Sequence, residues 1–287
     1  MAITEQIRNP IEWGWDQIRV LQRALGATGH ALGGAEEVTA TVRKISVDDL
    51  RDALARGAAD FAACRTDVIF LCLIYPAAGL FLAHLAFGYD FLPLLFPLAS
   101  GFALIGPVAA VGLYEMSRRR EQGHHATWAD GLGVIKSPAA GAILVLGLYL
   151  LAIFIAWMVV AYGIYSMTLG PQPPASATAF VSAVFTTAAG WTMAVIGIGV
   201  GFLFAVAALT ISVVSFPMLL DRDVGLYPAI GTSIRAVAAN PFPMAVWGAI
   251  VTGGLVLGTI PFFIGLAVVI PILGHATWHL YRKLVPR

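Results

Sequence analysis

The chain has 287 residues, of which 59% are hydrophobic and only 11% are charged, and its formal net charge is +1. A soluble domain averages about 25% charged residues and less than half apolar ones, so this composition is typical of a multi-pass membrane protein with short loops. The small net charge gives no reason to expect a nucleic-acid partner. Cys64 and Cys72 lie eight residues apart on one expected helix, roughly 12 Å from each other, which excludes a disulfide between them.

Residues 1–45 are expected to form a separate cytoplasmic N-terminal segment. Ile11, Trp15 and Ile18 fall at helical spacing, which favours a helix lying at the membrane interface, where Trp is common. The Gly-containing stretch GATGHALGGAEE (26–37) favours a loosely ordered tail instead. Both interpretations stay open at this point.

A first surface helix is predicted over Val47–Ala63. Ser46 precedes it as a candidate N-cap, and Asp48 and Asp49 fall in the first turn, where the helix dipole favours acidic side chains. One apolar face is expected to rest on the membrane. The residues of this face are Leu50, Leu54, Ala58 and Phe61.

Residues 46–287 are predicted to form a single polytopic domain, an all-α bundle with six transmembrane helices. About 20 apolar residues at 1.5 Å per residue cross about 30 Å of hydrocarbon. Prolines at 93, 97 and 107 should kink the second crossing, because each lacks the backbone N–H that a helix requires. The six expected crossings cover about 68–87, 91–114, 139–166, 191–220, 242–260 and 262–278.

Two more amphipathic segments, 126–136 and 227–239, each follow a short polar stretch, 115–125 and 221–223, which we call the first and second polar corner. Both segments should lie on the same membrane surface as the first helix. The apolar stretch 179–189 is too short to cross and is expected to be interfacial or re-entrant. The order of surface helix, outward crossing and inward crossing thus occurs three times. It is either a threefold helix-hairpin repeat or the ordinary periodicity of a membrane protein built from hairpins.

The positions of the basic residues predict the orientation of the bundle. All 17 Lys and Arg residues fall before residue 68, in 115–138, in 221–241 or after residue 279, and none falls in an expected outer loop. Basic residues concentrate in cytoplasmic loops of membrane proteins. With an even number of crossings, both termini are therefore expected to be cytoplasmic.

Two histidines could bind a metal ion or haem. His275 and His279 are four residues apart, so they share one helix face near the inner end of the last crossing. Two neutral imidazoles at this spacing could ligate haem, copper or zinc, although a functional site needs further ligands. The alternative is a pair of interfacial histidines that bond to helix carbonyls or to acidic side chains.

The polar corners carry the other candidate residues. Acidic side chains just after a helix C-terminus oppose the helix dipole, so they are expected to cap the next helix or to pair with arginines; the alternative is a proton- or cation-handling role. Most of the expected crossings contain no Asp, Glu, Lys, Arg or His, which argues against an ion-coupled transporter. The corner residues are Glu115, Arg118, Asp221, Arg222, Asp223 and Arg235.

Sequence motifs of common enzymes are missing. The chain has no Gly-rich phosphate loop, no GxSxG nucleophile elbow and no HExxH zinc motif. We therefore expect no catalytic residue, no cofactor and no enzymatic activity.

Six segments are distinctive in combination. They are VRKISVDDLRDALARGAADF (42–61), RTDVIF with IYP (65–76), LFPLASGFALIGPVAAVGLYEMSRRRE (95–121), SFPMLLDRDVG (215–225), TSIRAVAANP (232–241) and LGHATWHLYRKLV (273–285). They resemble a family of predicted integral membrane proteins of proteobacteria that is classed as a domain of unknown function. The resemblance covers about 42–285.

This resemblance implies a bacterial inner-membrane location and a six-helix bundle, and it supplies no reaction. Some members carry a cytochrome-oxidase-subunit label, but the multiple histidine ligands of an oxidase core are absent here.

The sequence thus leaves three hypotheses on function. The first is a non-enzymatic accessory or scaffold protein of the inner membrane, with the lipid bilayer and another membrane protein or complex as partners. The second is a transporter or channel for a small neutral or lipid-like solute. The third is a haem- or metal-binding redox accessory protein.

Overall fold

A computed structural model describes the chain except for residues 1–39, 73–83, 85–91, 262 and 287. The predictions for the N-terminal segment and for most of the first crossing therefore lie outside the described residues. The described residues are helical, as expected, and contain no strand. Their helices are α2 (Val47–Cys72), η1 (Leu92–Leu94), α4 (Leu95–Ala109), α5 (Val111–Glu121), α6 (Trp128–Leu132), η2 (Gly133–Lys136), α7 (Ala140–Thr168), α8 (Ala177–Thr186), α9 (Ala188–Ser212), α10 (Ser215–Asp221), α11 (Leu226–Ala239), α12 (Pro241–Thr259) and α13 (Leu266–Leu284).

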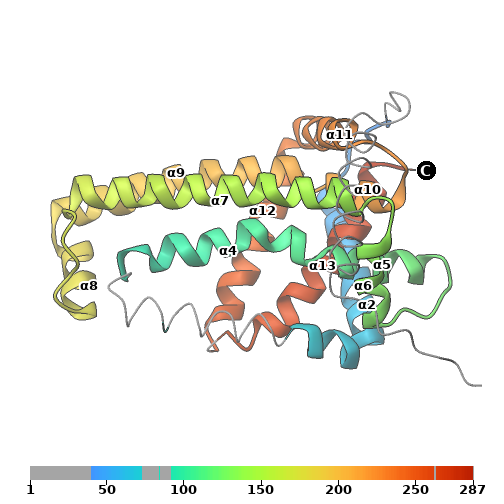
Figure 1. Cartoon of the computed structure of the whole chain (residues 1–287), viewed down its shortest axis with the longest axis horizontal. Coiled ribbons are helices and arrows are strands. Elements are labelled where there is room, and N and C mark those ends of the chain that lie inside the picture. The colour runs from blue at the N-terminus through green and yellow to red at the C-terminus, as the bar shows by residue number, and fades with distance from the viewer. Residues whose placement is uncertain (1–39, 73–83, 85–91, 262, 287) are drawn as a thin grey trace, which may run out of the picture.

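Three helical stretches in the described part of the chain are long and apolar enough to cross a membrane. They are α7, the pair α9 and α10 taken together as Ala188–Asp221, and α12. Figure 1 shows α7 and α9 side by side along the longest axis of the molecule, with the short helix α8 across their far ends. The short helix α8 fits the interfacial or re-entrant piece that was predicted at 179–189.

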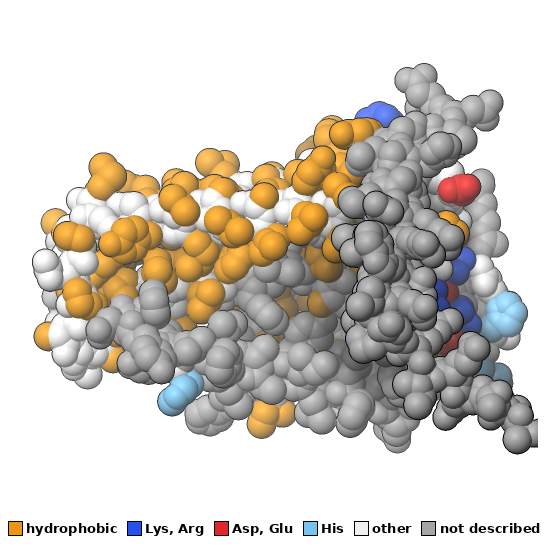
Figure 2. Space-filling model, in the orientation of Figure 1, with side chains coloured by type: hydrophobic (Ala, Val, Ile, Leu, Met, Phe, Trp, Pro, Cys, Tyr) orange, Lys and Arg blue, Asp and Glu red, His pale blue; other side chains and the backbone are white. Residues whose placement is uncertain are grey.

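The outer surfaces of these helices are apolar. Large side chains that a soluble protein would bury are more than half exposed, among them Val159 on α7, Phe202 on α9 and Leu257 on α12. Figure 2 shows hydrophobic side chains covering the elongated part of the molecule that α7 and α9 form. Lys, Arg, Asp and Glu side chains gather at the other end, which we call the charged end. An apolar surface this extensive has to face lipid, because soluble monomers rarely expose one.

The count of six crossings is not confirmed. The expected second crossing, 91–114, is divided at Ala110 into α4 and α5, and Pro107 lies inside α4. Helix α4 has only 15 residues. Helix α13 begins at Leu266, later than expected, and its second half is polar.

The charged end of the molecule is built by α2, α5, α10 and the second half of α13. Helix α2 is longer than the predicted surface helix, because it continues through Ala63 to Cys72. Ser46 caps it as expected: its Oγ accepts from the Asp49 backbone N–H at 3.3 Å, and the Asp49 carboxylate accepts from the Ser46 N–H at 2.9 Å.

The buried face of α2 differs from the predicted one. Leu50 is buried as expected, but Ala58 is exposed. The reason is that α2 packs closely on α13 through small side chains: a Cβ added to Gly57 would lie 2.6 Å from the Ala276 backbone nitrogen. The residues of the buried face are Leu50, Ala53, Gly57, Asp60 and Cys64.

Helices occur at both predicted surface segments, and their place on a membrane surface stays a prediction. Residues 126–136 form α6 and η2, with a capping box between Thr127 and Asp130, and residues 227–239 fall within α11, which lies across the ends of α7 and α9 (Figure 1). The order of surface helix and two crossings is thus visible in part, but the first unit passes through undescribed residues and the threefold repeat stays a prediction.

Candidate functional site

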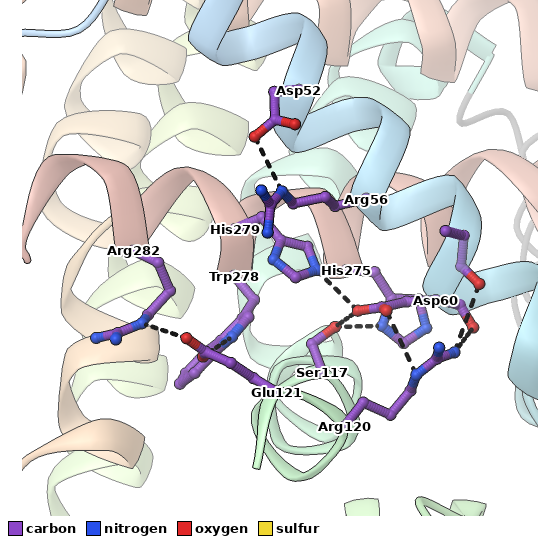
Figure 3. Close-up of polar contacts among 11 residues, drawn as sticks. Asp52, Arg56, Asp60, Ser117, Arg120, Glu121, His275, Trp278, His279 and Arg282 are labelled. Carbon is purple, nitrogen blue, oxygen red and sulfur yellow. Dashed lines mark hydrogen bonds and ion pairs between the residues drawn. The ribbon is translucent and has the colours of Figure 1, made fainter. Parts of the chain in front are cut away.

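A buried polar cluster lies where α2, α5 and α13 meet (Figure 3). Its centre is Asp60, which is 7% exposed. One carboxylate oxygen, Oδ2, accepts hydrogen bonds from the Ser117 hydroxyl at 2.6 Å and from His279 Nε2 at 2.9 Å. The other oxygen, Oδ1, lies 3.5 Å from Arg120 Nε, and Arg120 also donates to the backbone carbonyl of Asp60 at 3.1 Å. Three helices are thus joined through one carboxylate.

His275 extends the cluster into the core. Its Nδ1 lies 2.8 Å from Ser117 Oγ. The single hydroxyl proton of Ser117 is directed to Asp60, so Ser117 accepts from the N–H at Nδ1, and Nε2 then carries the lone pair. The ring is fully buried, and Nε2 has no hydrogen-bond partner in the described part of the chain.

The charge states follow from these contacts. Burial disfavours the charged carboxylate of Asp60, but the hydrogen bonds from His279 and Ser117 outweigh burial, so the pKa of Asp60 is lowered. His275 lies on α13, which is not one of the three apolar spans. Burial lowers the pKa of His275 to about 4, although the negative charge of Asp60 favours the protonated ring. At neutral pH the centre therefore holds an ionised Asp60 and an uncharged His275.

This arrangement is not a hydrolytic triad. In a triad the serine bonds to the imidazole nitrogen opposite the one that faces the carboxylate, whereas Ser117 here lies between Asp60 and His275 and donates to the carboxylate. Ser117 is also fully buried, so no external substrate reaches its oxygen. The geometry fits a connection between helices.

The predicted metal pair is brought into this cluster but is engaged by protein side chains. His279 contacts Asp60 and His275 contacts Ser117. Within the described ranges, no group of three His, Cys, Asp or Glu side chains is placed so that it could hold a metal ion. A metal or haem at His275 and His279 stays a prediction.

The first polar corner is held together internally. Glu115 is 4% exposed and accepts from Arg118 at 2.7 and 2.9 Å and from Arg119 at 2.9 Å. The hydrogen bond to Glu115 raises the pKa of Arg118. Arg119 also reaches Asp130 of α6 at 2.7 Å. The expected pairing of Glu115 with Arg118 is thus present, and it fastens the surface segment α6 to α5.

The second corner contains the expected pair of Asp221 with Arg222, at 3.9 Å, and also partners that were not predicted. Asp221 accepts from the Tyr281 hydroxyl at 2.8 Å and from Arg282 at 3.2 Å, both on α13, while Arg222 Nε lies 3.9 Å away. Burial, followed by the charge of Asp221, raises the pKa of Tyr281. Arg222 also donates to the carbonyl of Pro286 at 2.6 Å. The corner therefore binds the C-terminal segment to α10.

Asp223 and Arg235 do not join this corner. Asp223 is exposed, and Arg235 donates to Thr232 on its own helix at 2.9 Å. Neither makes an ion pair within the described residues.

Two further bridges hold α13 in place. Glu121 accepts from the Trp278 ring N–H and from Arg282, each at 3.1 Å. Lys283 lies 2.8 Å from Asp52 and 3.1 Å from Asp49 of α2; the hydrogen bond to Asp52 is the largest effect that raises the pKa of Lys283.

Sequence reasoning missed the central residue of the site. Asp60 lies outside the apolar face that was predicted for this helix. The available signal was the spacing of Ala53 and Gly57, two small residues that indicate a close helix contact and place Asp60 on that same buried face. The further residues of the site that were not singled out are Ser117, Arg120, Glu121, Trp278, Tyr281, Arg282 and Lys283.

The three spans expose apolar side chains, which together we call the apolar belt, and the charged groups gather at one end and pair with one another. These two features are typical of a multi-pass integral membrane protein. Residues 95–221 match the model of a family described as Predicted integral membrane protein (DUF2189). The resemblance to a membrane-protein family of unknown function is thus confirmed over α4 to α10, which include Glu115, Ser117, Arg120 and Asp221. No curated protein and no solved structure matches the chain.

Proposed function

We propose that this protein is a non-enzymatic accessory or scaffold protein of the bacterial inner membrane, which supports another membrane protein or complex. One observation carries the proposal: the ionisable groups at the charged end are used to join α2, α5, α10 and α13 to one another. The apolar spans α7, α9 and α12 contain no Asp, Glu, Lys, Arg or His. Functional transport and redox proteins usually place such residues inside the membrane.

The topology that goes with this proposal has six crossings and two cytoplasmic termini. The three apolar spans supply half of them. The distribution of Lys and Arg supports the orientation, with the charged end in the cytoplasm.

Purification of the tagged full chain from native membranes in two mild detergents tests the accessory role. The expected result is one membrane protein that co-purifies at fixed stoichiometry in both. A matched purification of an unrelated six-helix membrane protein, made at the same level, controls for incidental association. A homogeneous chain that carries only lipid in both detergents contradicts the proposal.

A transporter or channel for a small neutral or lipid-like solute is the alternative. The prolines inside α4 and α13, Pro107 and Pro271, favour it, because a helix that bends can open a path. Flux of neutral solutes into vesicles that contain the purified chain, compared with empty vesicles, tests it. Absence of solute flux and of lipid movement overturns this alternative.

A haem- or metal-binding redox role is the third candidate, and the unpartnered Nε2 of buried His275 is the observation that favours it. The absorption spectrum and metal content of the purified chain test it. A Soret band or bound metal that His279→Ala removes, and that the exposed-site control His124→Ala leaves, supports this role. A colourless, metal-free protein rules it out.

A further inference from the structure

Most basic side chains at the charged end have acidic partners, but a small group does not. Of the twelve Lys and Arg side chains that the structure describes, eight lie within 4 Å of a carboxylate. The remaining four are exposed and make no ion pair with described residues. They are Arg43, Lys44, Lys136 and Arg235.

Asn240, the residue between α11 and α12, ties the segment that carries Arg43 and Lys44 to the end of α11. Its side chain, 2% exposed, accepts from the Ile45 N–H at 2.8 Å and donates to the Arg43 carbonyl at 3.1 Å. The Arg43 N–H also donates to Leu284 at 2.8 Å. Arg235 lies five residues before Asn240, roughly 7.5 Å along the helix axis. The fold thus brings the extended segment at 43–45 beside the end of α11.

Large apolar side chains are exposed in the same region. Ile234 on α11 is 46% exposed, and Phe242 at the start of α12 is 68% exposed. Helix α11 lies across the ends of α7 and α9 (Figure 1), and Figure 2 shows a Lys or Arg side chain beside the hydrophobic side chains over α11. Phe242 is the second residue of the apolar span Pro241–Thr259, so this region lies at the edge of the apolar belt.

We infer that Arg43, Lys44 and Arg235 form a binding surface for the acidic headgroups of phospholipids. We call these three residues the basic patch. Basic groups without acidic partners attract anionic headgroups, and the neighbouring aromatic and aliphatic side chains enter the acyl boundary. Ile234 and Phe242 continue the patch into the apolar surface of the spans, and this continuity favours lipid over an acidic protein or a nucleic acid. Asp223 is exposed just before the start of α11, and its negative charge would repel an anionic headgroup there. The patch therefore includes only the C-terminal end of α11.

A lipid titration of the full-length chain in neutral detergent tests the inference, with bound lipids counted by native mass spectrometry. The probes are phosphatidylglycerol, which is anionic, and phosphatidylcholine, which has no net charge. The patch variant is Arg43→Gln/Arg235→Gln. The matched control is Arg51→Gln/Arg56→Gln, which removes two exposed arginines that pair with acids on α2.

Wild type is expected to bind phosphatidylglycerol more tightly than phosphatidylcholine. The patch variant should lose about 25-fold in affinity for phosphatidylglycerol, roughly fivefold per base, and the control should lose less than about twofold. Phosphatidylcholine binding should stay unchanged in all three proteins. If the patch variant does not fold, Arg235→Gln alone provides the test, because among the described residues that side chain hydrogen-bonds only to Thr232, on its own helix.

Three outcomes overturn the inference. One is equal affinity of the wild type for both lipids. Another is an equal loss of phosphatidylglycerol binding in the patch variant and the control, which would mean that only net charge matters. The last is displacement of the lipid by an acidic protein or nucleic acid that the patch variant no longer retains.

Discussion

Asp60 illustrates how a buried carboxylate can join helices that are far apart in sequence. Its partners come from positions 117, 120 and 279, so the carboxylate is satisfied only after α2, α5 and α13 have all docked. A charged group in a low-dielectric interior is costly unless every partner is in place. The cluster therefore contributes to the specificity of this arrangement as well as to its stability.

Asp60→Asn is expected to lower the free energy of unfolding by about 3 kcal/mol, because it leaves Arg120 facing a neutral group in a buried site. The measurement is thermal or denaturant unfolding of the purified chain in detergent. Asp48→Asn is the control: its partner Arg51 and Asp48 itself are 78% and 85% exposed, and exposed pairs contribute less than about 1 kcal/mol. Equal effects of the two substitutions would contradict the central role of Asp60.

His275 should make stability depend on pH. In the folded chain its pKa is about 4, against 6.5 for an ordinary histidine, so between these values the unfolded chain binds more protons. Stability is therefore full above about pH 6.5 and falls as the pH is lowered to about 4, by about 3 kcal/mol. Asp60 on α2, Arg120 on α5 and His279 on α13 are the charged or titratable groups that face the ring.

Unfolding midpoints measured from pH 7 to pH 4 check this dependence. In His275→Asn the shorter side chain keeps a donor for Ser117 and does not titrate, so the decline with acid should become shallower. His124→Asn, at an exposed position, should leave the wild-type decline unchanged. A decline of the same steepness in His275→Asn would assign the pH dependence to other groups.

At the scale of helices, small residues decide which faces meet. Gly57 allows α2 to approach α13 so closely that an added Cβ would lie 2.6 to 2.8 Å from atoms of Ala276. Gly201 and Gly254 similarly accept Trp157 and Val269. Gly201 on α9 and Gly254 on α12 thus serve packing within the chain.

Gly57→Ala should destabilise the chain by about 1–3 kcal/mol, since the extra methyl group forces α2 away from α13. Gly163→Ala on α7 is the matched control. No atom lies within 4 Å of its added Cβ, and alanine favours a helix over glycine by about 1 kcal/mol. In detergent unfolding, Gly57→Ala should therefore be less stable than wild type and Gly163→Ala more stable. An unchanged free energy of unfolding in Gly57→Ala would argue against close packing of α2 on α13.

The same packing explains what the sequence predicts and what it does not. Long apolar runs are a local property, so α7, α9 and α12 follow from residue order alone. The buried face of α2 was misassigned because alanines and a glycine carry less hydrophobic signal than Leu54 or Phe61. Which acid meets which base depends on tertiary docking: Asp221 lies beside Arg222 in sequence but bonds to Arg282, sixty-one residues away.

At the scale of the whole molecule, the two ends differ in chemistry. The loop between α7 and α8, residues 169–176, contains no charged residue, whereas α5, α10 and α13 gather acids and bases at the other end. An inner-membrane protein inserts with its basic loops in the cytoplasm. The charge asymmetry therefore predicts that the charged end of the molecule faces the cytoplasm.

Labelling of single cysteines in intact cells tests this orientation. In a chain with Cys64→Ala and Cys72→Ala, we introduce Ala175→Cys beyond α7 or Gln122→Cys after α5, both at exposed positions. A membrane-impermeant maleimide should label position 175 in spheroplasts, and position 122 only after permeabilisation. The opposite pattern would invert the bundle. Labelling of both positions before permeabilisation would place them on one side of the membrane, which is incompatible with a single passage of α7 between them.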